Sequence, residues 1–406
     1  MPHPSAFRSL DPETIENPFP FFAALREHAP VYWDPDLACF LVTRYADVWE
    51  VIHQPELFSS QVGPLTKLPP MEVLAELMKG RPPVHTLLSA DPPQHTRYRS
   101  LVTRAFAPRR VAGLEPAIRA LAHELIDRFA ARGEVELVSE FAVPFPLTII
   151  ADQLGVPRAD LPLFKRWSDD FVTFLGQIAE LPRLVEAARG IVAFQRYMVE
   201  RIEERRAERR DDILSEVVHA SVDGVEPLST DEVLSIAQQF MVAGNETSTN
   251  MISAAMLHLA RNPDAMRALL ADPGLIPNAI EETLRMESPT HVMFRVARRD
   301  TELAGTKLAA GARLAVVYGS ANRDAAKFPD PDRFDVRREN ARDHLAFGHG
   351  THYCLGAGLA RKEGVVALEA LLARLRGWRV PSSDPRHHPL FILRGLVELR
   401  GAFDPA

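Results

Sequence analysis

The stretch Phe347-Gly348-His349-Gly350-Thr351-His352-Tyr353-Cys354-Leu355-Gly356-Ala357-Gly358-Leu359-Ala360-Arg361 contains one of the two cysteines of this 406-residue chain. Cys354 lies in a glycine-rich loop, and the apolar spacing after it predicts a helix. A cysteine at the start of a helix faces backbone N–H groups and the positive end of the helix dipole, and both favour thiolate over thiol. The glycines let the backbone pass close to a flat, bulky group.

The number of sulfur donors restricts the kind of metal site that this stretch can form. Structural zinc sites and iron–sulfur clusters need more sulfur ligands than one. A single thiolate suits one axial bond to haem iron. The alternative interpretation of the stretch alone is a buried structural cysteine behind a glycine turn. The second cysteine, Cys39, is expected to pack as a small apolar residue.

The spacing Phe347-x-x-Gly350-x-x-x-Cys354-x-Gly356 resembles the haem-binding signature of the cytochromes P450, in the wording of soluble bacterial members. The resemblance implies haem b as cofactor, Cys354 as the ligand of its iron, and Phe347, Gly348, His352 and Gly356 as haem-binding residues. Matching features extend from about residue 15 to residue 400. We therefore expect one haem domain over residues 1–406, mainly α with small β-sheets (α+β), with a long central helix over the haem.

Composition and charge exclude several classes of protein. The formal net charge is −7 and the pI about 6.1, which does not suggest binding to nucleic acid or to an anionic membrane. Two cysteines make no disulfide framework, which fits a reducing cytoplasm. The N-terminus has no apolar signal-peptide region, and no run of about 18 apolar residues could span a bilayer. We expect a cytoplasmic monomer without a membrane anchor.

Residues 229–262 predict a second defining feature of the fold, a long helix. Ser229-x-x-Glu232 is a capping box, and the helical pattern continues to Asn262-Pro263, giving a helix of about 50 Å. Its middle, Ala243-Gly244-Asn245-Glu246-Thr247-Ser248-Thr249-Asn250, contains weak helix formers. Local opening of the hydrogen-bond ladder is expected there. The alternative is a kink filled with ordinary capping hydroxyls.

This middle segment is similar to the acid–alcohol pair on the distal side of cytochromes P450. The resemblance implies that the small Ala243 and Gly244 leave room for dioxygen over the iron. Thr247 would hydrogen-bond the oxygen, and Glu246 would connect that site to solvent protons. Glutamate in place of aspartate at position 246 is the least usual feature of the match.

Four residues are candidates for the haem propionates. His95 and Arg99 are four positions apart after Asp91-Pro92-Pro93, so they share one helical face that suits a carboxylate. By spacing alone, a solvated surface pair is the alternative. The resemblance assigns His95 and Arg99 to the propionates, and it adds Arg295 and His352.

The substrate pocket can be assigned only by analogy. Residues 59–94 are rich in Gly and Pro around one short apolar helix, and the resemblance makes them the loop over the pocket. Ordinary core packing is the alternative for each candidate. With His291 as a polar exception, the candidates are apolar and predict a hydrophobic small molecule such as a fatty acid, terpenoid, steroid or macrolide. The candidates are Leu87, Leu88, Phe171, Phe174, Phe240, Val292, Met293, Phe294, Phe391 and Ile392.

A buried ion network and the regular elements complete the sequence-based predictions. Glu282-x-x-Arg285 with Arg333 resembles the Glu–Arg–Arg network that braces the haem-side core of cytochromes P450. Strands are predicted at residues 31–33, 40–42, 290–297, 301–303 and 314–318. Helices are predicted at residues 46–52, 71–78, 112–131, 143–154, 161–175, 181–210, 213–221 and 276–290.

The reaction that the resemblance implies is monooxygenation of the substrate with O2 and two electrons. We expect no fused flavin or iron–sulfur domain, so a ferredoxin or flavodoxin with its reductase is the expected electron donor. Its docking patch could consist of Arg104, Arg109, Arg110, Arg361 and Lys362. The alternatives are a haem-thiolate sensor, a non-oxygenating haem enzyme, and a peroxide-driven peroxygenase, which usually lacks the acid–alcohol pair.

Overall fold

The computed structural model describes residues 3–62, 69–176, 179–381 and 385–405. It divides into two compact units. Unit 1 comprises Met1–Ser59, Gly113–Phe145 and Glu246–Ala406, and unit 2 comprises Ser60–Ala112 and Pro146–Asn245. That residues 1–406 form a single haem domain stays a prediction.

The main sheet of unit 1 has five strands in the order β1-β2-β8-β5-β3. Strands β2 and β8 pair in parallel, and the other neighbours pair antiparallel. Parallel pairing requires a long crossover, which the chain between residues 42 and 313 provides. The strands are β1 (Val31–Asp34), β2 (Cys39–Val42), β3 (Phe58–Ser59), β5 (Val292–Ala297) and β8 (Arg313–Val317).

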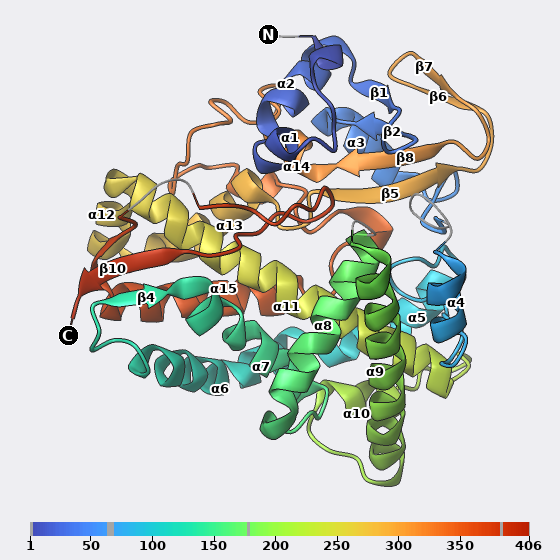
Figure 1. Cartoon of the computed structure of the whole chain (residues 1–406), viewed down its shortest axis with the longest axis horizontal. Helices are drawn as coiled ribbons and strands as arrows, with labels where there is room; N and C mark the ends of the chain where they lie inside the picture. The colour runs from blue at the N-terminus through green and yellow to red at the C-terminus, as the bar shows by residue number, and fades with distance from the viewer. Residues whose placement is uncertain (1–2, 63–68, 177–178, 382–384, 406) are drawn as a thin grey trace. The chain divides into compact units, whose positions relative to one another are not determined.

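The two faces of this sheet bury different hydrophobic clusters, because side chains alternate along a strand. Val42, Leu314 and Val316 join one cluster, to which helix α3 (Tyr45–His53) adds Val48, Val51 and Ile52. Leu41, Ala315 and Val317 join the other cluster, to which helix α2 (Phe19–His28) adds Phe21, Phe22 and Leu25. Figure 1 shows α2 and α3 beside β1, β2 and β8.

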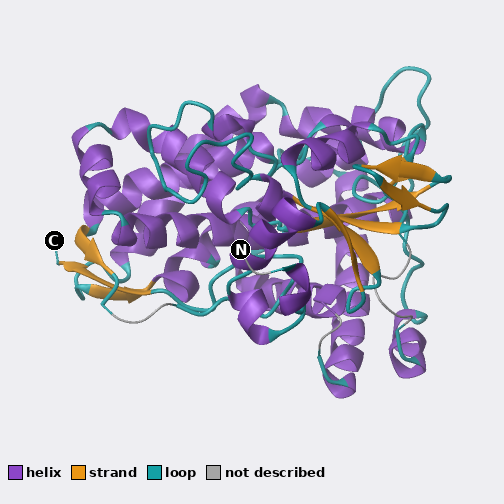
Figure 2. Ribbon diagram, turned by 90° about the horizontal axis from the view of Figure 1, so that it is seen from above, coloured by secondary structure: helices purple, strands orange, loops and turns teal. Residues whose placement is uncertain are grey.

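The remaining elements of unit 1 include two smaller sheets and several helices. A three-stranded sheet lies next to the C-terminus, as Figure 2 shows. Its strands are β4 (Glu134–Glu136), β10 (Arg400–Asp404) and β9 (Arg376–Arg379). Strands β6 (Thr301–Leu303) and β7 (Thr306–Leu308) form a hairpin. The helices are α1 (Pro12–Glu16), α12 (Pro263–Ala271), α13 (Ile276–Glu287), α14 (Tyr318–Ala321) and α15 (Ala357–Arg374).

Unit 2 is helical. Helices α8 (Leu161–Gly176) and α9 (Leu181–Ala207) pack against each other around Phe194, whose ring lies 5.8 Å from that of Trp167 and 5.5 Å from that of Phe171, centroid to centroid. The other helices are α4 (Met71–Leu77), α5 (Gln94–Val102) and α10 (Ile213–Val218). Three helices continue across a unit boundary in the sequence, namely α6 (Pro108–Asp127), α7 (Pro144–Gln153) and α11 (Thr230–Arg261).

Helix α11 (Thr230–Arg261) is the longest element, and its capping box is confirmed. The Ser229 N–H donates to the Glu232 carboxylate at 2.8 Å, and the Glu232 N–H donates to Ser229 Oγ at 3.3 Å. The predicted opening of its middle is wrong, because residues 230–261 are α-helical throughout. Asn245, Ser248 and Thr249, in the segment of weak helix formers, hydrogen-bond to groups outside the helix instead.

Most predicted elements are confirmed with shifts at their ends, while strands β3, β4, β7, β9 and β10 were not predicted. Single-turn elements connect the others: 3₁₀ helices at Pro4–Ala6, Thr103–Phe106, Arg158–Asp160, Pro273–Leu275, Ala341–Asp343 and Gly350–His352, and a π-helix at Val138–Ala142. In the part of the chain that the structure describes, no helix combines the length and apolarity needed to cross a bilayer.

Candidate functional site

The loop of residues 347–356, called here the Cys354 loop, is a tight backbone turn in unit 1. Gly348 and Gly350 have φ values of +62° and +67°, a left-handed conformation that favours glycine. The Cys354 N–H donates to the Phe347 carbonyl at 2.9 Å and closes the turn. Helix α15 begins directly after it, with Gly356 at the N-cap. Cys354 is half-buried at the N-terminus of this 18-residue helix.

The two cysteines have opposite surroundings. Cys39 starts strand β2 and is 0% exposed, and burial raises the pKa of its thiol to about 12. Such a thiol does not form the thiolate that ligates metals. Cys354 lies instead at a helix N-terminus, the location that favours the anion. The prediction that Cys39 packs as an apolar residue is confirmed.

One carboxylate holds both flanks of the Cys354 loop. Glu281, on α13, binds His344 Nε2 at 3.0 Å before the loop and Arg361 Nε at 2.6 Å after it. Burial alone would raise the pKa of Glu281, but the hydrogen bonds from His344 and Arg361 outweigh burial and lower it to about 2. The Arg361 guanidinium also lies 4.5 Å from the Phe347 ring centroid. Sequence reasoning missed Glu281, because its neighbour Glu282 carried the recognisable motif.

The neighbouring Glu282 forms the buried network that the sequence predicted, with one different member. The carboxylate accepts from Arg285 Nε at 2.7 Å and from Arg338 Nε at 3.0 Å, and both Glu282 and Arg285 are fully buried. The predicted third member, Arg333, is wrong. Its side chain is 68% exposed and pairs with Asp335. Only the Arg333 carbonyl joins the network, accepting from Arg338 at 2.9 Å.

The middle of α11 presents the predicted acid–alcohol residues along one helix. Ala243 is exposed, while Gly244, Glu246 and Thr247 are half-buried. A Cβ on Gly244 would approach Ile150 to 3.2 Å, so a small residue is required there. Ala243 and Gly244 belong to unit 2, and Glu246 and Thr247 belong to unit 1.

The other polar residues of this segment have structural partners. Asn245 donates to Ser168 Oγ at 3.2 Å within unit 2. Ser248 donates to the Glu363 carboxyl at 2.6 Å, and Thr249 donates to the Ala142 carbonyl at 2.9 Å, both within unit 1. These contacts keep the weak helix formers helical.

Glu363, on α15, is a second acidic residue that sequence reasoning missed. Its side chain is buried at 3% exposure, with Ser248 as hydrogen-bond donor. Burial raises the pKa of Glu363 to about 8, although the hydrogen bond from Ser248 acts in the opposite direction. The carboxyl group is therefore mostly protonated at neutral pH. In sequence it looks like one more charge on a solvated helix.

The four propionate candidates divide between the units. His95 and Arg99 lie on α5 in unit 2, where His95 is 2% exposed and Arg99 is half-buried. Burial lowers the pKa of His95, and the nearby Arg99 charge lowers it further. Arg295 and His352 lie in unit 1. Arg295 is 4% exposed on β5, and its Nη1 donates to the Phe294 carbonyl at 2.7 Å, while His352 is half-buried in the Cys354 loop.

The pocket candidates of unit 2 have varied surroundings. Phe171 packs on Phe194, and the Phe240 ring lies 5.0 Å from that of Phe106 in an edge-on arrangement. Leu88 is 54% exposed. Leu87 and Phe174 are half-buried. Positions 63–68 of the predicted pocket loop, which include Leu65 and Leu68, lie outside the described residues.

The pocket candidates of unit 1 line the sheet cores or lie next to them. Val292 is fully buried in the cluster of Phe21 and Leu41, and Phe294, Phe391 and Ile392 pack against that cluster. Met293 packs against the cluster on the opposite face.

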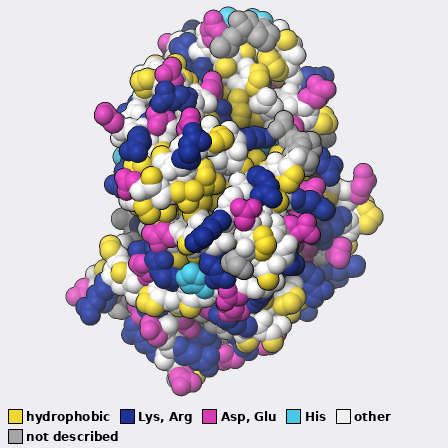
Figure 3. Space-filling model, turned by 90° about the vertical axis from the view of Figure 1, so that its left-hand side faces the viewer, with side chains coloured by type: hydrophobic (Ala, Val, Ile, Leu, Met, Phe, Trp, Pro, Cys, Tyr) yellow, Lys and Arg dark blue, Asp and Glu magenta, His cyan; other side chains and the backbone are white. Residues whose placement is uncertain are grey.

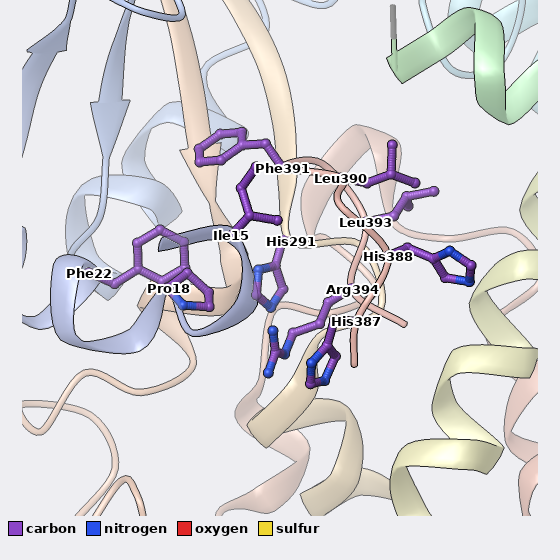
Figure 4. A pocket seen from close by; sticks show the side chains of 10 residues that line it. All are labelled: Ile15, Pro18, Phe22, His291, His387, His388, Leu390, Phe391, Leu393 and Arg394. Carbon is purple, nitrogen blue, oxygen red and sulfur yellow. The ribbon is translucent and has the colours of Figure 1, made fainter. Parts of the chain in front are cut away.

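A small cleft in unit 1 includes one of these candidates. Phe391 lines it together with His291, His387 and Arg394, whose side chains Figure 4 shows close together. His291 Nε2 lies 2.9 Å from the Glu287 carbonyl, and burial lowers the pKa of His291 to about 3. The predicted polar exception is therefore a neutral, internally bonded histidine. The remaining lining residues are Ile15, Pro18, Phe22, His388, Leu390 and Leu393.

The basic residues proposed for docking already have acidic partners in several cases. Arg361 pairs with Glu281, and Lys362 pairs with Glu115 in unit 1. Arg110 pairs with Asp211 in unit 2. Figure 3 shows the same intermixing of Lys and Arg with Asp and Glu on the face that it presents.

Donor chemistry decides which metal cofactor suits the Cys354 loop. Within residues 3–62, 69–176, 179–381 and 385–405, no group of three or more His, Cys, Asp or Glu side chains could hold a metal ion together. A lone thiolate therefore fits an iron whose other ligands come from a porphyrin. The turn also brings the backbone near the thiol, because a Cβ on Gly356 would lie in van der Waals contact with Cys354 Sγ at 4.0 Å.

Comparison with known proteins agrees with this geometry. The family model "Cytochrome P450" matches residues 170–273 and 274–393. The chain is 42% identical over 365 residues to mycinamicin IV hydroxylase/epoxidase of Micromonospora griseorubida, covering 89% of this chain and 88% of that protein. It is 36% identical over 384 residues to a steroid C26-monooxygenase of Mycobacterium tuberculosis H37Rv, covering 94% and 92%. The solved structure of CYP109Q5 from Chondromyces apiculatus has a TM-score of 0.87 at 38% identity and 98% coverage of both chains. The chain therefore belongs to the cytochrome P450 family and is a monooxygenase of that family.

Proposed function

We propose that this monooxygenase binds haem b with Cys354 as the iron ligand. The observation that carries the proposal is the half-buried Cys354 at the N-terminus of α15, in a turn that two left-handed glycines make. Phe347, Gly348 and Gly356 would shape the backbone around the group. His95, Arg99, Arg295 and His352 are proposed to bind the propionates, because each side chain carries an N–H group that can donate to a carboxylate.

The haem, when bound, supplies the redox-active iron that activates dioxygen. The chain's own residues hold and move protons. Ser248 and Thr249 on α11 donate to Glu363 and to the Ala142 carbonyl. From the resemblance of Ala243-Gly244-x-Glu246-Thr247 to the acid–alcohol pair of the family, we assign the proton-carrying hydroxyl to Thr247, and Glu246 is the carboxylate that exchanges protons with solvent. Ala243 and Gly244 keep the adjacent helix surface small, which leaves room for a diatomic molecule.

A macrolide or a steroid is the substrate class that we propose. Relatives that act on such molecules cover most of the chain, since a mycinamicin hydroxylase/epoxidase and a steroid C26-monooxygenase match at 42% and 36% identity. The candidate pocket residues are apolar, which suits a hydrophobic ligand. A ferredoxin or flavodoxin with its reductase is the proposed electron donor.

A spectroscopic experiment tests the iron ligand. The reduced carbon-monoxide complex of the purified holoenzyme should show the Soret band of thiolate ligation. Cys354→Ser should lose that band, and the control Cys39→Ala should keep it. An imidazole-type band in the wild type, or an unchanged band in Cys354→Ser, would contradict the proposal.

A turnover experiment tests the reaction and the substrate class. Macrolides and steroids are screened for a Soret shift on binding, and the compounds that bind are incubated with NADPH, ferredoxin and ferredoxin reductase. Oxygenated product should require the redox pair, and peroxide alone should not replace it. Equal turnover with peroxide alone would favour a peroxygenase. Absence of product from all compounds that bind would contradict the proposed substrate class.

A further inference from the structure

A pair of histidines in unit 1 lies outside the residues that we assign to the monooxygenase site. His53 is the last residue of α3, and His349 lies between the two left-handed glycines of the Cys354 loop. His53 Nε2 and His349 Nδ1 are 2.8 Å apart. His349 is exposed and His53 is half-buried, so the two nitrogens lie at a surface that solutes can reach.

The tautomer of His53 follows from its second contact. His53 Nδ1 lies 2.7 Å from the Trp49 carbonyl oxygen, which can only accept a hydrogen bond. Nδ1 therefore carries the proton, and Nε2 presents a lone pair toward His349. In the metal-free protein, His349 Nδ1–H donates to that lone pair. Once His349 adopts its other neutral tautomer, two lone pairs face each other.

The distance between these nitrogens suits chelation. Two nitrogens that each bind one Zn²⁺ at about 2.0–2.1 Å are about 2.9 Å apart at a right angle and about 3.4 Å apart at the tetrahedral angle. The observed 2.8 Å is close to the right-angle value, which suits the square geometry of Cu²⁺, and the two rings must move apart to reach the tetrahedral value of Zn²⁺. A metal-ligating histidine usually donates its other ring N–H to a carbonyl or carboxylate, and His53 already does so.

The surroundings hold both rings in place. The Trp49 ring lies 4.2 Å from that of His53 and 4.3 Å from that of His349, centroid to centroid. A Cβ on Gly350 would approach the Ile52 carbonyl to 3.1 Å, so the loop is in direct contact with the end of α3. Burial and the neighbouring His53 lower the pKa of His349, which favours the neutral form that binds metals.

We propose that His53 and His349 form a chelating site for a divalent transition metal, with Cu²⁺ bound more tightly than Zn²⁺. Imidazole nitrogen suits both ions, and the order follows from the general affinity series of divalent metals. The other coordination positions face solvent and are filled by water. A bound ion links α3 to the Cys354 loop five residues before Cys354.

Metal titration of the tag-free holoenzyme tests the site. Zn²⁺ binding is followed by isothermal titration calorimetry, and Cu²⁺ binding by electron paramagnetic resonance, in which coupling to two imidazole nitrogens is expected. His53→Gln and His349→Gln should each weaken metal binding about a hundredfold. Removing only the hydrogen-bond partner of a metal ligand already lowers metal affinity roughly 10–100-fold. The matched control is His28→Gln, since His28 and His3 stack with centroids 6.0 Å apart in the same unit.

The outcomes decide between a metal site and a hydrogen-bonded pair. Loss of the same binding event in both variants, with His28→Gln unchanged, supports the proposal. Unchanged affinity in both variants, or no wild-type binding up to millimolar Zn²⁺ and Cu²⁺, overturns it. Haem content and the reduced carbon-monoxide band verify that each variant is folded. If His349→Gln loses haem, His53→Gln decides alone, because His53 lies outside the Cys354 loop.

Discussion

The Cys354 loop and residues 60–94 differ in how the fold holds them. The flanks of the Cys354 loop are fixed by buried charged groups, with Glu281 at 2% and Glu282 at 0% exposure. In the described part of residues 60–94, ion pairs such as Lys79 with Glu76 and Arg81 with Asp231 each include an exposed cation, and a buried hydrogen bond joins the Ser60 N–H to Asp91. Exposed pairs contribute about 0–1 kcal/mol each, whereas breaking a buried pair costs about 3–5 kcal/mol.

This difference explains what a sequence can tell about such an enzyme. Buried contacts hold the residues that flank the proposed iron ligand, so the spacing of these residues is a strong signal. Helix α4, in the segment over the proposed pocket, exposes 75% of Met71, and Met78 directly after it is 84% exposed. Side chains as exposed as these can be substituted without loss of the fold. The reaction is therefore readable from short motifs, and the substrate is not.

The largest expected effect comes from breaking the buried network next to the Cys354 loop. Glu282→Ala leaves Arg285 and Arg338 as buried cations without their shared carboxylate. We expect a loss of about 3–5 kcal/mol in the free energy of unfolding, or failure to fold. Urea unfolding followed by circular dichroism measures it. The control Arg333→Ala should cost less than about 1 kcal/mol, because that side chain is exposed. Equal costs would contradict the assignment of Arg338 to the network.

The next effect depends on pH and concerns Glu363. Its folded pKa of about 8 lies above the ordinary value of 4.5, so folding favours the protonated form. Wild-type stability should therefore fall as pH rises from about 5 through about 8, by on the order of a few kcal/mol. Glu363→Gln keeps an acceptor for Ser248 but cannot ionise, so its stability relative to wild type should rise over that window.

Denaturant unfolding of the holoenzyme at several pH values between 5 and 9 measures the effect of Glu363→Gln. The control Glu369→Gln, on the same helix, removes a partly exposed carboxylate opposite Arg119. A difference between Glu363→Gln and wild type that stays constant with pH would show that the carboxyl group is not protonated in the folded protein.

A smaller effect is expected on catalysis alone. Thr247→Ala should lower product formation about a hundredfold, which matches general acid–base contributions of roughly 10²–10⁴-fold. Consumption of NADPH should fall much less, so product per NADPH should drop. Product and NADPH are measured in the same reaction. Thr249→Ala, on the same helix, is the control, because the Thr249 hydroxyl donates to the Ala142 carbonyl. Equal loss of product per NADPH in both variants would remove the special role of Thr247.

The smallest effect is expected in the weakly held region. Met78→Ser changes a side chain that is 84% exposed, so stability should change by less than about 0.5 kcal/mol. Haem content should stay the same. Thermal unfolding and the reduced carbon-monoxide spectrum check both. A loss of haem would show that residues 60–94 are held more firmly than their surface contacts indicate.

The sequence predicted much of the fold because its signals are local. The capping box at Ser229 and Glu232 and the glycine turn before α15 are each set by a few neighbouring residues. Strand β4 was missed because it is three residues long and exists through pairing with β10, more than 260 positions later. No local pattern reports such pairing.

The missed site residues share a physical reason. Glu281 and Glu363 are acidic residues on helices, a pattern typical of solvated faces, and only tertiary packing buries them. Arg338 replaced Arg333 because the path of residues 329–338 decides which guanidinium reaches Glu282. The roles of Thr247, Glu246 and the propionate candidates stay predictions that the experiments above test.

The bond of Glu281 to both His344 and Arg361 has a practical consequence for protein engineering. One anchor on α13 sets the contour length of the chain between positions 344 and 361. An insertion or deletion within that span would break the contact of Glu281 with either His344 or Arg361. Transferring the cysteine-bearing segment into another protein therefore requires moving two separated pieces of sequence together, namely α13 and residues 344–361.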